Sequence, residues 1–423
     1  MGTFSGYRCT LCGAEYPPRQ PIYTCPADGG NLNVLLDLRQ VRRQLGADQL
    51  PLEGEPSLWR YLPLLPVDDP GGRGTALRLA GWTPVLEPVR LAAELGLRRL
   101  WVKDESRNPS ASFKDRASAV LMARARQIKA EVVVTASTGN AGAALACMAA
   151  ALGSKAVIFA PRQAPPAKVA QLLVFGATVL LVDGNYDDAI ELSLQASTAF
   201  GWYCRNTGYN PFTAEGKKTA AFEIWDWRRR LSPDFELSQL KLFVPVGDGN
   251  IISGIHKGFK DLQALGWIAA PPQLIGVQAE GSAAIANAYL RQTEQIAPVQ
   301  AHTIADSISV DLPRDGVRAV RAAVQTGGRY VLVSDAEILA GIAQLGKAGV
   351  FAEPAGAAAY AGLVKARREG WIGSDDPVLV LNTGSGLKDV RAAMQAVKEA
   401  PIIEPSLAAL KRMIQSTNLH DTT

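Results

Sequence analysis

A lysine stands where a polar, turn-prone stretch runs into small apolar residues. The stretch reads NPSASFKDRASA over residues 108–119, and it predicts a helix that begins near Lys114. An ammonium group is unfavourable at a helix N-terminus, because that end carries partial positive charge. The same neighbourhood favours the neutral amine, which is the form that attacks a carbonyl carbon. Lys114 is therefore either a surface cation beside Asp115 or a functional amine.

Three glycine-rich turns follow predicted strands. The first, at 137–140, opens a helix whose free amides could bind a carboxylate, although Ser137 or Thr138 could equally be an ordinary helix cap. The second, GDGN at 247–250, lets the backbone approach an anion closely, or is a plain tight turn. Its glycine spacing fits neither a dinucleotide fingerprint nor a Walker A loop. The third places Thr383 at the end of the last apolar strand, as a site hydroxyl or a cap.

Lys114 and the three glycine-rich turns together match what pyridoxal 5′-phosphate requires. The cofactor needs an amine for its carbonyl carbon, an anion-binding turn for its phosphate, and polar partners for its ring. We expect Lys114 to supply the amine and the 247–250 turn to bind the phosphate. Asn140 can hydrogen-bond the ring hydroxyl, and Thr383 can meet the pyridine nitrogen.

Short runs rich in Val, Ile and Leu alternate with helical patterns from Trp82 onward. The runs cover 99–103, 131–136, 155–160, 178–184, 241–247, 273–277, 329–333 and 377–384. They lack polar alternation, so we expect both faces of each strand to be buried in mostly parallel sheets. Helical patterns such as 139–153 and 165–176 would form the crossovers. The stretch 56–67, rich in Trp, Leu and Pro, reads as an extended arm.

This alternation predicts the α/β class, with two doubly wound, mostly parallel domains. We place a large cofactor-binding domain at 41–118 and 206–423, a small domain at 119–205, and a separate N-terminal segment at 1–40.

The N-terminal segment resembles a degenerate zinc ribbon. Cys9 and Cys12 form one C-x-x-C knuckle, and Cys25 begins a second in which Asp28 takes the place of the fourth cysteine. Three thiolates and a carboxylate are a weaker zinc signal than four thiolates. A metal-free ribbon held by its glycine turns is the alternative, and we name no metal ligand from the sequence.

Composition excludes several classes of protein. The 423 residues are 48% hydrophobic and 20% charged, with 44 basic and 40 acidic side chains, which gives a net charge of +4. This balance favours neither nucleic acid nor an anionic membrane as a partner. No run reaches the roughly 20 apolar residues of a membrane helix, and the first residues lack the apolar core of a signal peptide. Five cysteines predict a reducing, cytoplasmic location.

The chain resembles threonine synthase and the wider tryptophan-synthase-β-like group of fold-type II pyridoxal-phosphate enzymes. The motifs NPSASFKDR, STGNAG, PVGDGN, EPAGA (353–357) and TGSGLKD carry this resemblance in family order, to about residue 395. It implies that Lys114 is the catalytic, cofactor-linked lysine. It also implies cofactor contacts from Asn140, Gly247, Asp248, Gly249, Asn250 and Thr383.

The resemblance further implies a reaction. A threonine synthase is a lyase that converts O-phosphohomoserine and water to threonine and phosphate, and members of the family are commonly dimers. Ser137 and Thr138 would bind the substrate carboxylate. A neutral hydroxyl at the ring nitrogen favours elimination and replacement over transamination, by analogy with the family.

The stretch NTGYNPFTAEGKKT, 206–219, departs from the family pattern. Thr213 stands where the family has a phosphate-binding arginine, and Lys217 stands where it has glutamine. Ser385 replaces the histidine of the family's T-G-H-G. We expect Asn210, Thr213 and Lys217 to bind the substrate phosphate, with Lys217 replacing the lost charge. A solvated lysine at a helix start is the alternative for Lys217.

These departures keep other reactions open. One is a relative that uses another activated amino acid, such as cysteate synthase acting on O-phosphoserine and sulfite. Another is a threonine or serine dehydratase, which needs no phosphate pocket. A third is a cofactor-binding protein without catalysis, against which the retained Lys114 and the 247–250 turn argue.

Overall fold

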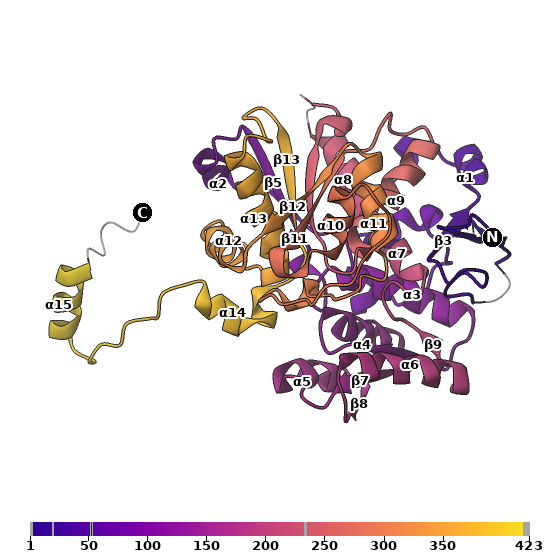
Figure 1. Cartoon of the computed structure of the whole chain (residues 1–423), viewed down its shortest axis with the longest axis horizontal. Helices are drawn as coiled ribbons and strands as arrows, with labels where there is room; N and C mark the ends of the chain where they lie inside the picture. The colour runs from indigo at the N-terminus through magenta and orange to yellow at the C-terminus, as the bar shows by residue number, and fades with distance from the viewer. Residues whose placement is uncertain (1–2, 19–20, 51, 53, 232–234, 418–423) are drawn as a thin grey trace.

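Three separate sheets organise the chain. The computed structural model describes residues 3–18, 21–50, 52, 54–231 and 235–417 (Figure 1). The largest sheet lies in the upper half of Figure 1, the second lies below it, and the N-terminal sheet lies to one side. The helices are α1 (Leu38–Gln44), α2 (Val89–Glu94), α3 (Lys114–Gln127), α4 (Asn140–Leu152), α5 (Pro166–Val174), α6 (Tyr186–Phe200), α7 (Phe212–Lys217), α8 (Thr219–Arg230), α9 (Asn250–Ala264), α10 (Ala284–Leu290), α11 (Gly316–Gln325), α12 (Asp335–Lys347), α13 (Pro354–Arg368), α14 (Val390–Gln395) and α15 (Leu407–Thr417).

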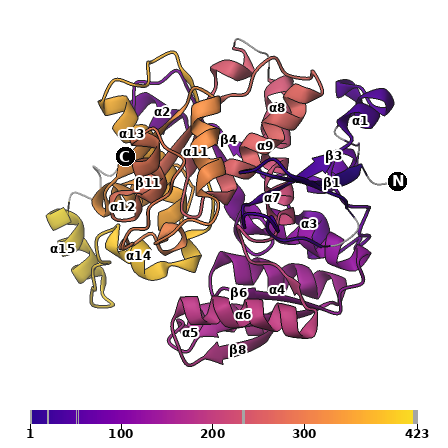
Figure 2. The ribbon, with the colours of Figure 1, turned by 45° about the vertical axis from the view of Figure 1, so that its right-hand side comes forward.

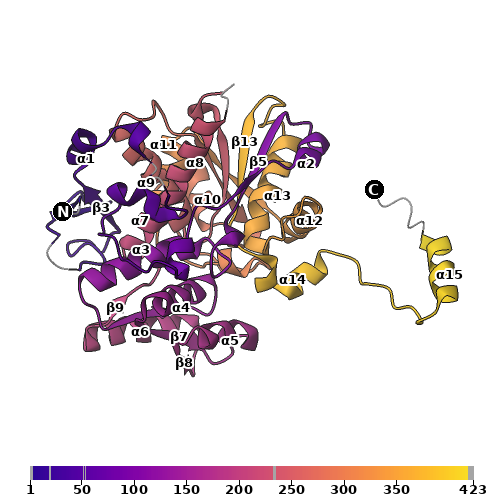
Figure 3. The same ribbon diagram turned by 180° about the vertical axis from the view of Figure 1, so that it is seen from behind.

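The large sheet has the strand order β12-β11-β10-β13-β5-β4. Its strands are β4 (Val85–Leu86), β5 (Arg99–Asp104), β10 (Lys241–Pro245), β11 (Gln273–Ala279), β12 (Arg329–Val333) and β13 (Pro377–Asn382). Neighbours pair in parallel, except that β4 is antiparallel to β5. Figure 3 shows β5 beside β13, although their paired residues Asp104 and Asn382 are 278 positions apart in sequence.

The second sheet has the order β8-β7-β6-β9 and is entirely parallel. Its strands are β6 (Val132–Ala136), β7 (Lys155–Pro161), β8 (Thr178–Val182) and β9 (Tyr203–Cys204). The predicted α/β class with mostly parallel sheets is therefore confirmed. The domain boundaries at 41, 119 and 206 stay a prediction.

Both faces of the large sheet are buried, which explains why its strands lack polar alternation. In β13, Val378 and Val380 pack into one apolar cluster with residues of α12 and α13. The intervening Leu379 and Leu381 pack into another cluster, with residues of α8, α9 and α11. Apolar side chains are thus needed at every position of a central strand.

Two expectations for local structure are wrong. The strand β8 was expected to be buried on both faces, but it lies at the sheet edge, and Leu180 and Leu181 are exposed. The stretch 56–67 was expected to be extended, but Leu58–Leu64 forms 3-10 turns. The Ser57 hydroxyl caps these turns by accepting from the Trp59 amide, and the turns bury Trp59 and Tyr61. A 3-10 helix can bury large side chains on both sides of its backbone, and it does not need a neighbouring strand to pair with.

The N-terminal sheet is antiparallel, with the order β2-β1-β3. It contains β1 (Phe4–Cys9), β2 (Glu15–Tyr16) and β3 (Leu32–Leu36), and it packs beside α7 and α3 in Figure 2. We call the described residues of 3–36 the ribbon. Phe4 and Tyr7 of β1 pack edge-on against Phe212 of α7. The Asn31 amide donates to the Gly208 carbonyl at 2.7 Å, which joins the ribbon to the 206–210 turn.

Elsewhere, α15 stands apart from the three sheets in Figures 1 and 3. Within the described ranges, the helices are too short or too polar to cross a membrane.

Candidate active site

One pocket lies at the carboxyl ends of β10 and β13, which are neighbours in the large sheet. Ligands of open parallel sheets bind at this edge. The pocket has an empty volume of about 510 Å³, its open mouth included. Its lining consists of Phe113, Lys114, Asn140, Thr207, Lys217, residues 245–252, Ser307, Ile308, Glu353, Ala355 and Thr383.

The pocket brings together eight of the residues that the sequence singled out. They are Lys114, Asn140, Lys217, Gly247, Asp248, Gly249, Asn250 and Thr383. Within the described part of the chain, Ser137, Thr138, Asn210 and Thr213 do not line it. The Asn210 amide is already used by backbone, since it donates to the Cys204 carbonyl and accepts from the Phe212 amide. The Thr213 hydroxyl reaches the pocket only indirectly, at 3.2 Å from Asn250 Oδ1.

Backbone contacts fix Lys114 beside Thr383. The amide of Phe113 donates to the Thr383 carbonyl at 2.9 Å, and the Ser385 amide donates to the Ala111 carbonyl at 3.1 Å. These bonds join the turn before α3 to the turn after β13. Helix α3 begins at Lys114, as the sequence predicts.

The two residues after Lys114 anchor the helix start. Asp115 accepts from the Ser110 amide at 2.7 Å and from the Ser110 hydroxyl at 2.6 Å. Arg116 is fully buried and pairs with Glu105 at 2.7 Å and with Glu223 at 2.5 Å. A guanidinium between two buried carboxylates holds one geometry strongly. The helix start is thus rigid while the Lys114 side chain points into the pocket lining.

The Lys114 amine has no hydrogen bond or ion pair among the described residues, although its environment is charged. Burial lowers its pKa below the ordinary lysine value, and the Arg205 guanidinium lowers it further. Glu353 and Asp248 act in the opposite direction and are the smaller influences. A larger fraction of neutral amine results at any given pH. The environment therefore favours the functional amine over the surface cation.

The 247–250 turn needs both of its glycines. A Cβ at Gly247 would lie 2.7 Å from the Ile308 Cα. Gly249 has φ +89°, and a Cβ there would lie 2.7 Å from the Asp315 carbonyl oxygen. Helix α9 begins directly afterwards at Asn250. The first amides of a 15-residue helix have no acceptor within the helix, so they form an anion-binding end at the pocket.

Lys217 is fully buried, so the alternative of a solvated lysine is wrong. Its ammonium donates to Asn250 Oδ1 at 2.5 Å, and the Asn250 amide donates to Asp315 at 2.6 Å. Burial holds the pKa of Lys217 well below its ordinary range, and the charges of Lys114 and Arg205 add to this. Lys217 thus lies at the anion-binding end of α9, and no carboxylate of the described ranges is bonded to it.

Sequence reasoning missed Arg205, a buried cation that lies outside the described pocket lining but lowers the pKa of both Lys114 and Lys217. This side chain is fully buried, and Nη1 donates to the Thr207 hydroxyl at 2.6 Å. Its Nη2 is buried and has no hydrogen-bond partner in the described part of the chain. Burial lowers the pKa of Arg205 to about 10. Its position directly after the two-residue strand β9 gave no motif to recognise.

Glu353 was also missed as a site residue, although the EPAGA motif contained it. The Asn140 amide donates to the two Glu353 oxygens at 2.8 and 3.0 Å. Burial raises the pKa of Glu353. The Thr383 hydroxyl, in contrast, has no hydrogen bond within the described residues, and its side chain is nearly buried in the lining.

The fold and this pocket define an α/β enzyme built to hold a phosphorylated carbonyl cofactor beside a lysine. The chain belongs to the pyridoxal-phosphate-dependent enzyme family, whose model matches residues 76–384. Threonine synthase from Methanocaldococcus jannaschii is 38% identical over 411 residues, which is 96% of this chain and 99% of that protein. Threonine synthase from Methanosarcina acetivorans is 36% identical over 410 residues, 96% of this chain and 98% of that one.

A solved structure shares the fold. The processed form of threonine deaminase isoform 2 from Solanum lycopersicum aligns with a TM-score of 0.62 and 23% identity. The alignment covers 80% of this chain and 83% of that one.

The pocket fits pyridoxal phosphate by the chemistry of its donors. It offers a helix end with free amides, and an amine and a hydroxyl that have no partner among the residues that the structure describes. These groups suit the phosphate, the carbonyl carbon and the ring of the cofactor, respectively.

Proposed function

We propose that this chain is a pyridoxal-phosphate-dependent threonine synthase, which converts O-phosphohomoserine and water to threonine and phosphate. The observation that carries the proposal is a surplus of buried positive charge. The charge of Arg205 lowers the pKa of Lys114, and the charges of both lower the pKa of Lys217. Among the described residues, Lys217 and Arg205 have no bonded carboxylate. Buried cations are costly unless an anion compensates them. A cofactor phosphate and a substrate phosphate would together supply that charge.

The proposal assigns the cofactor contacts as follows. Lys114 holds the cofactor covalently through its carbonyl carbon, and residues 247–250 hold its phosphate at the N-terminus of α9. Thr383 offers its hydroxyl to the ring nitrogen. Asn140 contacts the ring hydroxyl, and the hydrogen bond that its amide donates to Glu353 fixes the orientation of the amide. The cofactor, when bound, supplies an electron sink for the carbon atoms of the substrate.

Lys114 is also the proton carrier. Its free amine would take a proton from one substrate carbon and return it to another. The lowered pKa suits this exchange, because the amine must accept and release a proton near neutral pH. Few of the neighbouring side chains are free to do the same, since Lys217 is held by Asn250 and Glu353 by Asn140.

The substrate is held at two ends. Its carboxylate lies on the start of α4, where Ser137 and Thr138 precede free helix amides. Its phosphate lies near Lys217 and Arg205, and Thr213 supports Lys217 through the shared contact with Asn250. Asn210 shapes the same turn without contacting substrate, because its amide is bonded to backbone.

Enzyme assays separate this function from the alternatives. With O-phosphohomoserine, we expect phosphate and threonine to form in equal amounts. A dehydratase would instead release a 2-oxo acid from threonine or serine, and a cysteate-synthase-like enzyme would require O-phosphoserine and sulfite. Efficient deamination of threonine without turnover of O-phosphohomoserine would refute the proposal.

The proposal includes a setting for the enzyme. We infer a cytoplasmic homodimer, with residues 41–118 and 206–423 as the large cofactor-binding domain and 119–205 as the small one. The five cysteines are free thiols, which is usual for proteins of a reducing compartment and so supports the cytoplasmic location.

A further inference from the structure

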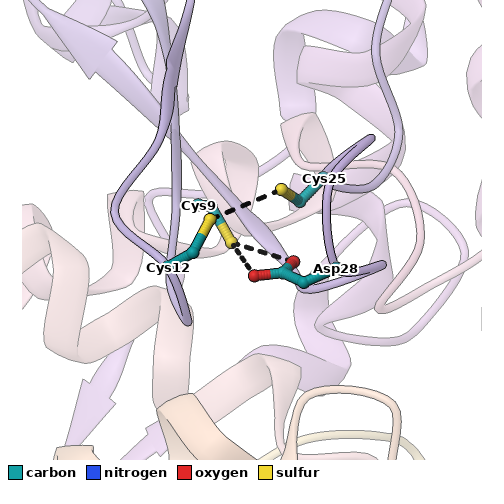
Figure 4. A group of neighbouring side chains, drawn as sticks. All are labelled: Cys9, Cys12, Cys25 and Asp28. Atoms are coloured by element: carbon teal, nitrogen blue, oxygen red, sulfur yellow. Dashed lines mark hydrogen bonds between the residues drawn. The ribbon is translucent and has the colours of Figure 1, made fainter.

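The ribbon contains a cluster of four side chains that the reaction does not use. Figure 4 shows Cys9 and Cys12 on one turn facing Cys25 and Asp28 on another. One ligand atom from each of the four lies within 4.8 Å of all the others. Cys9 and Cys25 are buried, while Cys12 and Asp28 lie at the surface. The four ligand atoms therefore surround one point near the surface of the ribbon.

We propose that these four residues bind one zinc ion in a tetrahedral, structural site. A zinc ion with Zn–S bonds of about 2.3 Å and a Zn–O bond of about 2.0–2.2 Å requires S···S separations of about 3.8 Å and S···O separations of about 3.5 Å. The Sγ atoms of Cys12 and Cys25 are 3.8 Å apart. Cys9 Sγ lies 3.3 and 3.4 Å from the two Asp28 oxygens. These two ligand pairs are close to tetrahedral separations, and 3.8 Å is far too long for a disulfide bond.

The surrounding hydrogen bonds hold the ligands in place. The Leu11 amide donates to Cys9 Sγ at 3.3 Å, and the Gly30 amide donates to Asp28 Oδ1 at 2.8 Å. The Tyr16 hydroxyl lies 3.1 Å from Cys25 Sγ. Such outer contacts orient metal ligands and stabilise thiolates.

Backbone geometry closes both turns. Gly13 and Gly29 have φ +76° and +71°, values that favour glycine, and each follows a ligand residue. The Cys9 amide donates to the Ala14 carbonyl at 2.8 Å, and the Gly29 amide donates to the Cys25 carbonyl at 2.8 Å. The turn at residues 9–12 and the turn at residues 25–28 thus each carry two ligand residues, and the two pairs face each other.

The site is structural, because all four positions are filled by protein atoms and no ligand position remains for substrate. It lies on the ribbon, and its residues do not line the pocket of the described chain. Metal binding closes the loop between residues 9 and 28, and binding energy at such a site is folding energy.

Metal analysis of the full-length protein tests the proposal. We expect one equivalent of zinc per chain in protein purified under reducing conditions. After the zinc is removed, Co²⁺ should give the intense thiolate-to-metal absorption and the visible bands of a tetrahedral site. Cys12→Ser, at an exposed ligand, should lose the metal and lower the unfolding temperature.

Two further variants make the outcome decisive. Asp28→Cys should retain zinc against a chelator better than the natural protein, because it supplies a fourth thiolate. Cys147→Ser, a buried cysteine outside the cluster, should keep the full equivalent of zinc. Reduced, folded protein that contains no zinc and gives no thiolate absorption with Co²⁺ would overturn the proposal. Unchanged metal content in Cys12→Ser would do the same.

Discussion

Replacing Lys217 by glutamine tests the phosphate pocket most directly. Glutamine can keep the hydrogen bond to Asn250 Oδ1 but removes the charge. A hydrogen bond from a charged donor contributes about 1.5–3 kcal/mol. Since about 1.4 kcal/mol corresponds to a tenfold change in rate, we expect kcat/KM for O-phosphohomoserine to fall by about 10- to 150-fold. Most of the loss should appear in KM, because the phosphate is held before it leaves.

The stability of the Lys217→Gln variant, unlike its kcat/KM, should not fall. Lys217 is a buried cation to which no described carboxylate is bonded, so removing its charge should leave the unfolding temperature of the ligand-free protein unchanged or raised. Inorganic phosphate should inhibit the variant less than the natural enzyme. Cofactor affinity, measured by fluorescence titration, should change far less than KM.

The neighbouring lysine provides a matched control. Lys218 is equally buried, but its ammonium pairs with Glu215 at 2.6 Å and Asp261 at 2.8 Å, and it does not belong to the lining of the described pocket. Lys218→Gln should lower the unfolding temperature and leave KM for O-phosphohomoserine unchanged. The reasoning fails if Lys217→Gln keeps kcat/KM within about twofold of the natural value, or if it weakens only cofactor binding.

Three further predictions concern the cofactor. Lys114→Ala should abolish turnover and the borohydride-stable link between cofactor and protein; a modified peptide containing another lysine, found by mass spectrometry, would contradict the assignment. Thr383→Val should fold, bind cofactor and turn over at least tenfold more slowly, whereas unchanged kinetics would make Thr383 a cap. Arg205 lowers the pKa of Lys114 and Glu353 raises it, so Arg205→Gln should shift the midpoint of cofactor capture by the ligand-free protein to higher pH, and Glu353→Gln should shift it to lower pH. Stopped-flow absorbance across pH 6–10 measures both midpoints, and shifts in the same direction would refute this account.

The strand pattern and the start of α3 could be predicted because they depend on local sequence. Runs of Val, Ile and Leu mark strands whose two faces are buried, and the turn before Lys114 marks a helix start. The burial of β8 was wrongly predicted, because its own residues do not reveal that it lies at a sheet edge.

The charge balance of the site depends on contacts that are distant in sequence. Glu353 approaches Asn140 across 213 residues, and Lys217 approaches Asn250 across 33. The spacing around Thr213 and Lys217 indicated a change in the phosphate site, but the burial of Lys217 followed only from the packing of α7 between other elements. Arg205 carries no motif, so its unpaired guanidinium atom could be found only in the structure.

The position of β13 determines when the pocket can form during synthesis. This strand is among the last in the chain, yet it lies in the middle of the large sheet, between β10 and β5. While the ribosome is still translating residue 376, β5 and β10 have no strand between them, and Thr383 does not yet exist to fix Lys114. The all-parallel sheet of residues 132–204 can close much earlier, because its strands are near one another in sequence. Nascent chains are therefore expected to bind no cofactor until the last central strand has been made, so that cofactor capture is a late, post-translational event.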